Sequence, residues 1–159
     1  MNFTPYPYLP DGREIQYVSA DNFFMDAARK AVEELSTVSN QKTGAVVVKD
    51  GVIIGRGANQ SRLKNKKLSV LHQRYCVRKL LHIKTGTRYW LCPGCANFRD
   101  HAESRAVFDA KQAWGDPCGA DLYLWGHWWC CKPCWDTMIA AGISRVYLLE
   151  GSEKLFKKN

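Results

Sequence analysis

Apolar residues recur at helical spacing in four segments of the chain. Six of them share one face between residues 21 and 36, where Asp21 is a suitable N-terminal cap. Two more segments with this spacing, 68–82 and 101–114, follow in the middle of the chain. A shorter segment at 131–141 is followed by glycine, which commonly ends helices. The pattern therefore predicts four helices.

Runs of β-branched and other apolar residues predict strands between these helices. Residues 44–59 form a predicted hairpin, because two such runs flank Asp50-Gly51, a strong turn signal. Two further strands are expected at 121–125 and 144–149. Residues 1–19 contain three prolines and are expected to form an irregular arm.

The order of these elements is helix, two strands, two helices, strand, helix and strand. Helices that alternate with short apolar strands predict an α/β fold, here a three-layer α/β/α sheet with helices on both faces. The length of 159 residues suits a single domain, 1–159. Within it, residues 60–98 form an insert after the hairpin, and residues 151–159 form a basic tail.

Composition narrows the class of protein. Apolar residues make up 46% and aromatic residues 12% of the chain, which is enough for a packed core. No apolar run approaches the roughly 18–20 residues that cross a bilayer. The start of the chain lacks the basic and apolar segments of a secretory signal. We therefore expect a cytoplasmic protein without a membrane partner.

The seven cysteines indicate metal binding rather than disulfides. Their odd number, without an export signal, argues against a disulfide framework. Four of them form two Cys-x-x-Cys pairs, Cys92/Cys95 and Cys131/Cys134, a spacing typical of zinc ligands. We therefore expect zinc as the cofactor, with one catalytic ion and a second, structural ion.

The first candidate zinc site combines His101 with Cys131 and Cys134. Three protein ligands leave a fourth position for water, as in catalytic zinc sites. A Cys-x-x-Cys at a helix start lets both sulfurs reach one ion, and the helix N-terminus favours the thiolate. Glu103 is not needed for coordination, so it can move protons between water and a substrate nitrogen. Each motif alone has a simpler interpretation. His-Ala-Glu could be a solvated helix start, and Cys-x-x-Cys could bind a structural zinc.

Together these motifs resemble the cytidine and deoxycytidylate deaminase superfamily over residues 20–150. His-Ala-Glu at 101–103 and Cys-Lys-Pro-Cys at 131–134 match its zinc motifs, and "MIAAGISRVYLL" at 138–149 looks like the helix end and strand that follow. The resemblance implies a cytidine-deaminase-like fold. It also implies that zinc is bound by His101, Cys131 and Cys134. Glu103 would shuttle protons, and Ala102 would contact the substrate.

Two departures from the family pattern precede the second motif. Cys130 stands where the family usually has proline, so it could compete for zinc, although the spacing from Cys134 onward favours Cys131. The loop before it, "WGHWW", is longer than usual. Because this loop lies where the family holds a pyrimidine, we expect Trp128 and Trp129 to contact the substrate.

A second candidate zinc site lies in the insert. His72 and Cys76 are four residues apart on a predicted helix, which places them on one face. The turn "CPGC" can present the sulfurs of Cys92 and Cys95 to the same ion. These four ligands would form a closed structural site, with His82 as a reserve candidate. The alternatives are an exposed His72 and a Cys76 buried in the core.

The insert also resembles the one in microbial and phage deoxycytidylate deaminases, where Cys and His bind a structural zinc. The segment "YCVRKLLHIKTGTRYWLC" at 75–92 carries this resemblance, which implies a nucleotide substrate. Asn59 matches the family residue that bonds the substrate sugar, and Arg62 lies where an arginine could bind phosphate. A turn asparagine and a solvated arginine are the alternatives.

The charge of the chain leaves other substrates open. A net charge of +8 favours anionic partners, but the dense basic runs at 62–67 and 154–158 are not concentrated beside the catalytic motif. The sequence therefore predicts hydrolytic deamination of dCMP to dUMP and ammonia, by a homo-oligomer if the family analogy holds. The alternatives are a deaminase of another nucleoside, nucleotide or nucleic-acid base, and a non-catalytic zinc module that binds nucleic acid or a protein.

Overall fold

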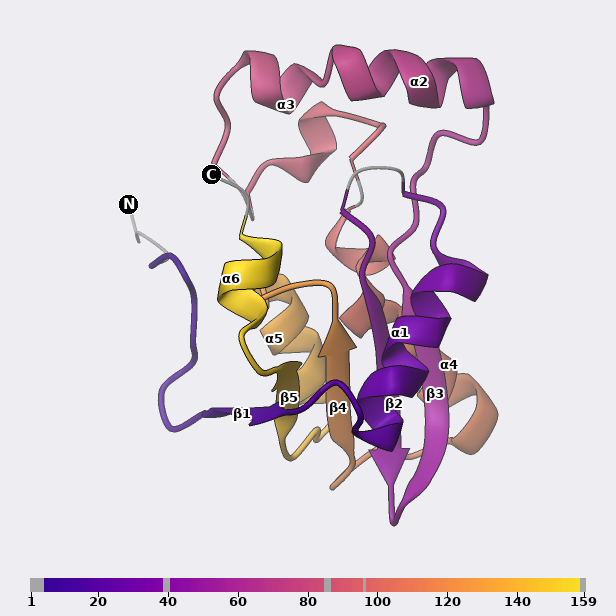
Figure 1. Ribbon diagram of the computed structural model, residues 1–159, viewed down its shortest axis with the longest axis vertical. Coiled ribbons are helices and arrows are strands. Elements are labelled where there is room, and N and C mark those ends of the chain that lie inside the picture. Colours follow the sequence, from indigo (N-terminus) through magenta and orange to yellow (C-terminus); the bar gives the residue numbers. More distant parts are fainter. Residues whose placement is uncertain (1–4, 39–40, 85–86, 96, 158–159) are drawn as a thin grey trace.

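The computed structural model describes residues 5–38, 41–84, 87–95 and 97–157, which contain a mixed five-stranded sheet (Figure 1). The strands are β1 (Ile15–Val18), β2 (Gly44–Lys49), β3 (Val52–Ala58), β4 (Asp121–Trp125) and β5 (Val146–Leu149). Their order across the sheet is β1-β5-β4-β2-β3. β1 and β4 run parallel to β5 between them, whereas β2 is antiparallel to both β4 and β3.

Helices cover both faces of the sheet, so the predicted α/β architecture is confirmed (Figure 1). The helices are α1 (Phe23–Leu35), α2 (Lys66–Arg74), α3 (Val77–Leu80), α4 (Ala102–Trp114), α5 (Lys132–Ala140) and α6 (Ser152–Phe156). Val46 and Val48 of β2 pack in one core cluster with α1. Ala45 and Val47 point to the opposite face and pack in a second cluster with α4 and α5.

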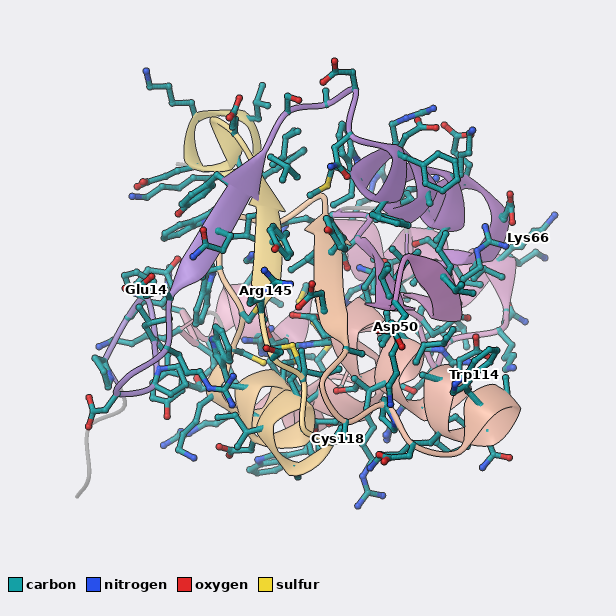
Figure 2. The ribbon with its side chains drawn as sticks, turned by 90° about the horizontal axis from the view of Figure 1, so that it is seen from below. Glu14, Asp50, Lys66, Trp114, Cys118 and Arg145 are labelled. Carbon is teal, nitrogen blue, oxygen red and sulfur yellow. The ribbon has the colours of Figure 1, made fainter. Side chains whose placement is uncertain are left out.

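The predicted hairpin is present, and its turn has the expected backbone. Asp50 and Gly51 have φ angles of 51° and 77°, as a type I′ turn requires. Figure 2 views the molecule from this end, with the helical layers on either side of the sheet. The helix predicted at 101–114 and the strand predicted at 121–125 are also found. No helix in the described residues is long and apolar enough to span a bilayer.

Two glycines of β3 let α4 lie close against the sheet. A Cβ atom on Gly57 would lie 2.3 Å from the backbone nitrogen of Ala106. One on Gly55 would lie 2.4 Å from the carbonyl oxygen of the same residue. Any side chain at either position would therefore push α4 away. This contact fixes the helix that carries Glu103 in its first turn.

The N-terminal region corrects two expectations. Residues 15–18, expected within an irregular arm over 1–19, form the edge strand β1. Two of its four side chains are exposed, so its apolar pattern is weaker than that of the central strands. α1 is capped by Asn22 rather than Asp21, because the Asn22 side-chain oxygen accepts hydrogen bonds from the backbone N–H groups of Phe24 and Met25. Residues 1–4 lie outside the described part.

The insert forms a separate layer at one end of the sheet (Figure 1). The single helix expected at 68–82 is instead two helices, α2 and α3. Cys76 stands between them with an extended backbone and a buried side chain, so the chain leaves the helix where this cysteine turns inward. The expected basic tail, 151–159, contains α6, and residues 158–159 lie outside the described part, as do 85–86 and 96 of the insert.

Candidate metal centre and active site

The fold brings His101, Cys131 and Cys134 together at the starts of two helices. His101 immediately precedes α4, Cys131 immediately precedes α5, and Cys134 lies in the first turn of α5. His101 Nδ1 is 3.6 Å from the Sγ of Cys131 and 3.4 Å from the Sγ of Cys134. Tetrahedral zinc, with bonds of about 2.05 Å to nitrogen and 2.3 Å to sulfur, places such atoms about 3.6 Å apart. The three donors therefore fit a zinc ion.

The two thiols of this group differ in their ease of ionisation. A hydrogen bond from Cys134 lowers the pKa of Cys131 to about 5, against the effect of burial, and His101 contributes in the same direction. The same hydrogen bond and burial raise the pKa of Cys134 well above its usual value. The pair therefore carries a thiolate on Cys131 at neutral pH, the form that binds metals.

Glu103 lies buried in the first turn of α4 and lines a cavity of about 220 Å³. His101 and Cys131 line the same cavity, so a carboxylate and two of the three candidate ligands share one space. Cys130 is fully buried behind it. Burial and the neighbouring Glu103 carboxylate, with which it forms a hydrogen bond, raise the pKa of Cys130 well above its usual value. Cys130 thus remains a thiol that donates to Glu103, and it is outside the metal-type group found among the described residues.

The residues expected to contact substrate have different positions. Asn59 and Trp129 line the cavity, whereas Arg62, Ala102 and Trp128 are not among the described residues that do. Arg62 is exposed and pairs with Asp100 at 3.0 Å. Trp128 lines a second, larger cavity of about 670 Å³ beside the N-terminal segment. Ala102 is fully buried at the start of α4.

Asn59 holds the cavity wall through its side chain. Its side-chain oxygen accepts hydrogen bonds from the backbone N–H of Thr43 at 3.0 Å and from the hydroxyl of Ser36 at 2.8 Å. Its amide nitrogen donates to the carbonyl of Gln41 at 2.6 Å. These bonds tie the loop after α1 to the end of β3, which gives Asn59 a clear structural role at the cavity.

His127 is a cavity residue that sequence reasoning did not assign. Its Nδ1 accepts hydrogen bonds from the backbone N–H groups of Trp128 and Trp129, at 3.0 and 3.2 Å. Burial and the neighbouring His101 lower the pKa of His127 to about 4. The ring is therefore neutral, and because Nδ1 accepts, the proton is on Nε2. The only sequence clue was its place in the long loop before the second motif.

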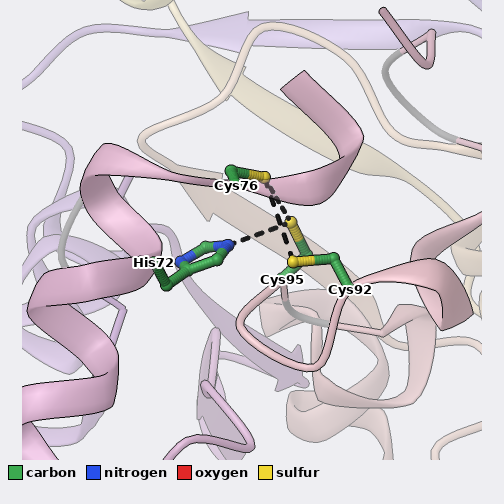
Figure 3. A group of neighbouring side chains, drawn as sticks. All are labelled: His72, Cys76, Cys92 and Cys95. Carbon is green, nitrogen blue, oxygen red and sulfur yellow. Dashed lines mark hydrogen bonds between the residues drawn. The ribbon is translucent and has the colours of Figure 1, made fainter. Parts of the chain in front are cut away.

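The four expected ligands of the insert also meet (Figure 3). Cys76 Sγ lies 4.0 Å from Cys92 Sγ and 3.5 Å from Cys95 Sγ, and Cys95 Sγ lies 3.6 Å from His72 Nε2. Two sulfurs on tetrahedral zinc are about 3.8 Å apart, so these donors also fit zinc. His82 is exposed and lies outside this group.

The turn between the two insert cysteines requires glycine at Gly94. A Cβ atom there would lie 2.2 Å from the imidazole ring of His72. The backbone can therefore pass directly beneath the ring only without a side chain. Burial raises the pKa of Cys95 to about 12. Metal binding at this group would therefore have to displace that proton.

These motifs match a known family across most of the chain. The model of the cytidine and deoxycytidylate deaminase zinc-binding region matches residues 18–150. The chain belongs to this family. It is thus a zinc-binding deaminase, although a search of curated proteins finds no match.

A solved deaminase structure shows the same fold, and two others are similar to parts of this chain. The dCMP deaminase of cyanophage S-TIM5, in complex with dCMP and dUMP, is 19% identical over 83% of this chain and 84% of its own, with a TM-score of 0.50. A deaminase/reductase of Thermotoga maritima is 26% identical over 79% of this chain and 28% of its own, with a TM-score of 0.47. Guanine deaminase of Bacillus subtilis is 18% identical over 83% of this chain and 66% of its own, with a TM-score of 0.45.

Two insert residues connect the metal-type groups of this deaminase, and sequence analysis missed both. Arg78 is buried and donates to the carbonyls of Thr87 and Lys84 and to the sulfur of Cys95. Its guanidinium carbon lies 4.1 Å from the centre of the Tyr89 ring. Arg78 and Tyr89 both line the cavity that contains Glu103. Their spacing along the chain gives no sign of this, because the contacts depend on how the insert folds back.

Proposed function

We propose that this protein is a zinc-dependent hydrolase that deaminates dCMP to dUMP and ammonia. The observation that supports the chemistry is the buried Glu103 carboxylate in the same cavity as His101 and Cys131. A buried acid beside three metal-type donors is costly for folding alone, and it suits proton transfer. The family membership and the resemblance of the insert support the choice of substrate.

The proposed ligands of the catalytic zinc are His101, Cys131 and Cys134. When bound, zinc supplies a Lewis acid that makes water a nucleophile near neutral pH. His101 and Cys131 line the same cavity as Glu103, so the carboxylate would lie in the space next to the ion. Ser104 supports the group, because its hydroxyl lies 3.8 Å from the sulfur of Cys134.

Glu103 is the proposed proton carrier. Its carboxylate would accept one proton from the attacking water and deliver it to N3 of the cytosine ring. It would then accept the second proton from the new hydroxyl group on C4 and pass it to the leaving amine. The water oxygen becomes the new carbonyl oxygen at C4, and the C4–N4 bond breaks to release ammonia. Cys130 would hold the carboxylate in place by donating its S–H to it.

The base and the phosphate would be held by residues of the long loop and the insert. His127 offers its Nε2–H to an acceptor on the base, and Trp129 has an indole N–H without a hydrogen-bond partner among the described residues. Arg78 brings a guanidinium to the cavity wall and suits a phosphate better than the outward-facing Arg62. Asn59 would keep the wall in place and present its amide to the sugar.

The insert group of His72, Cys76, Cys92 and Cys95 is the proposed site of a second, structural zinc. Four protein donors leave no open position, which favours a structural role. None of the seven cysteines forms a disulfide, as is usual in a reducing compartment, so we also propose a cytoplasmic location. A homo-oligomer is proposed by analogy with the family.

An ammonia-release screen with zinc analysis of the same preparation tests this function. The substrates are dCMP, cytidine, dCTP, free cytosine and a cytosine-containing oligonucleotide. We expect turnover of dCMP with the highest kcat/KM of the set. A higher kcat/KM for another compound would identify that compound as the substrate instead of dCMP. If zinc-containing protein turned over none of these compounds, the proposal that it is a deaminase of this kind would be contradicted.

A further inference from the structure

The excess positive charge of the chain lies entirely in the insert. Residues 60–98 contain nine Lys and Arg residues and no Asp or Glu, which leaves 14 basic and 15 acidic residues elsewhere. Eight of the nine are exposed, and the ninth is Arg78. The linear sequence suggested that basic residues are not concentrated near the catalytic motif. The fold places one of these cations, Arg78, on the wall of the cavity that Glu103 also lines.

The outward face of α2 presents cations along its length. Lys67 and Arg74 are two turns apart, so they share one face, roughly opposite His72. Neither takes part in a salt bridge found among the described residues. Lys66 lies at the outer edge of the molecule (Figure 2). At a rise of about 1.5 Å per residue, Lys67 and Arg74 are about 10 Å apart along the helix axis.

The insert also exposes two aromatic rings. The side chains of Tyr75, at the end of α2, and Trp90 are 59% and 77% exposed. Trp90 directly follows Tyr89, which lines the catalytic cavity. Stacking rings within a basic surface are typical of proteins that bind single-stranded nucleic acid. An insert-to-insert contact between two copies of this chain is disfavoured, because it would bring another nine positive charges against this face.

We propose that the insert surface, formed by Lys67, Arg74, Tyr75 and Trp90, binds single-stranded nucleic acid. The phosphates would follow α2, and bases would stack on the two aromatic rings. The proposal extends the function above, because it concerns binding of a polymer and holds whether or not free dCMP is deaminated.

Binding of a labelled oligothymidylate tests the proposal without involving deamination, because thymine carries no exocyclic amine. The test variant is Lys67→Glu/Arg74→Glu. Its matched control is Lys111→Glu/Lys154→Glu, which has the same net charge and alters exposed residues outside the insert. By fluorescence anisotropy we expect at least about a tenfold loss of affinity for the test variant only. Its log–log salt slope should shrink by about 1.4, since each cation contributes about 0.7 on single strands.

A second variant, Tyr75→Ala/Trp90→Ala, keeps the charge and removes the rings. We expect it to weaken binding with little change in the salt slope, because stacking releases no counterions. Equal losses in the test and control variants would overturn the proposal. So would failure of the wild type to bind the oligonucleotide, or tighter binding to phosphatidylcholine vesicles that contain phosphatidylserine. dCMP turnover, measured in the same preparations, reports separately on the function proposed above.

Discussion

The ring of Tyr89 meets the imidazole of His101 edge to face, with ring centres 5.0 Å apart and planes at 89°. On its other side Tyr89 lies against the guanidinium of Arg78, which also contacts the sulfur of Cys95 at 3.7 Å. This series of contacts runs from the insert group to the group at α4 and α5. The insert therefore helps to orient a candidate ligand of the catalytic zinc.

Replacing Tyr89 should weaken zinc binding at the catalytic group. We expect Tyr89→Leu to lose about tenfold or more in zinc affinity, because residues that orient a ligand typically contribute this much. Tyr89→Phe keeps the ring and should retain most of the affinity. Competition with a chromogenic chelator measures both variants, and a Tyr89→Leu protein with wild-type affinity would contradict the positioning role.

Metal content should report on the two groups separately. The wild type is expected to contain two zinc ions per chain by atomic emission, and His101→Ala and Cys92→Ala one each. Cys118→Ala is the matched control, because Cys118 is exposed and lies outside both groups. Cys92→Ala should also lower the melting temperature, since structural zinc contributes directly to folding. A wild type with a single zinc would mean that one group is not a metal site.

Cys130 should affect turnover but not metal content. Cys130→Ala removes the S–H that faces Glu103, so we expect kcat to fall several-fold while two zinc ions remain. Cys130→Ser restores a donor and should recover part of the rate. Loss of one zinc ion from Cys130→Ala would instead identify Cys130 as a ligand.

His127 makes stability sensitive to acid. Its pKa is lowered from 6.5 to about 4, so the unfolded chain takes up this proton more readily than the folded protein. The stabilisation of the folded protein by the neutral His127 ring is therefore fully present above pH 6.5 and is lost as the pH falls toward 4. Between pH 6.5 and 4, the free energy of unfolding should therefore fall by about 3 kcal/mol less for His127→Gln than for the wild type, as measured by denaturation at several pH values. Identical pH profiles would contradict the neutral, buried imidazole.

Sequence reasoning worked where local patterns determine the structure. The Asp50-Gly51 turn has a specific backbone requirement, and the spacing of Cys131 and Cys134 at a helix start is local, so both could be predicted. The short strand β1 was missed, because its residues form a strand only through pairing with β5. Arg78, Tyr89 and His127 could not be found, since their contacts depend on how the insert and the long loop fold over the cavity.

Exchange of the Glu103 carboxylate for an amide tests the central claim most directly. Glu103→Gln keeps the size of the side chain but cannot carry a proton. We expect zinc content equal to the wild type, and ammonia release from dCMP reduced by about a hundredfold or more, as expected when a general acid–base group is lost. Turnover close to the wild-type rate, in protein with the same zinc content, would contradict the proposed mechanism.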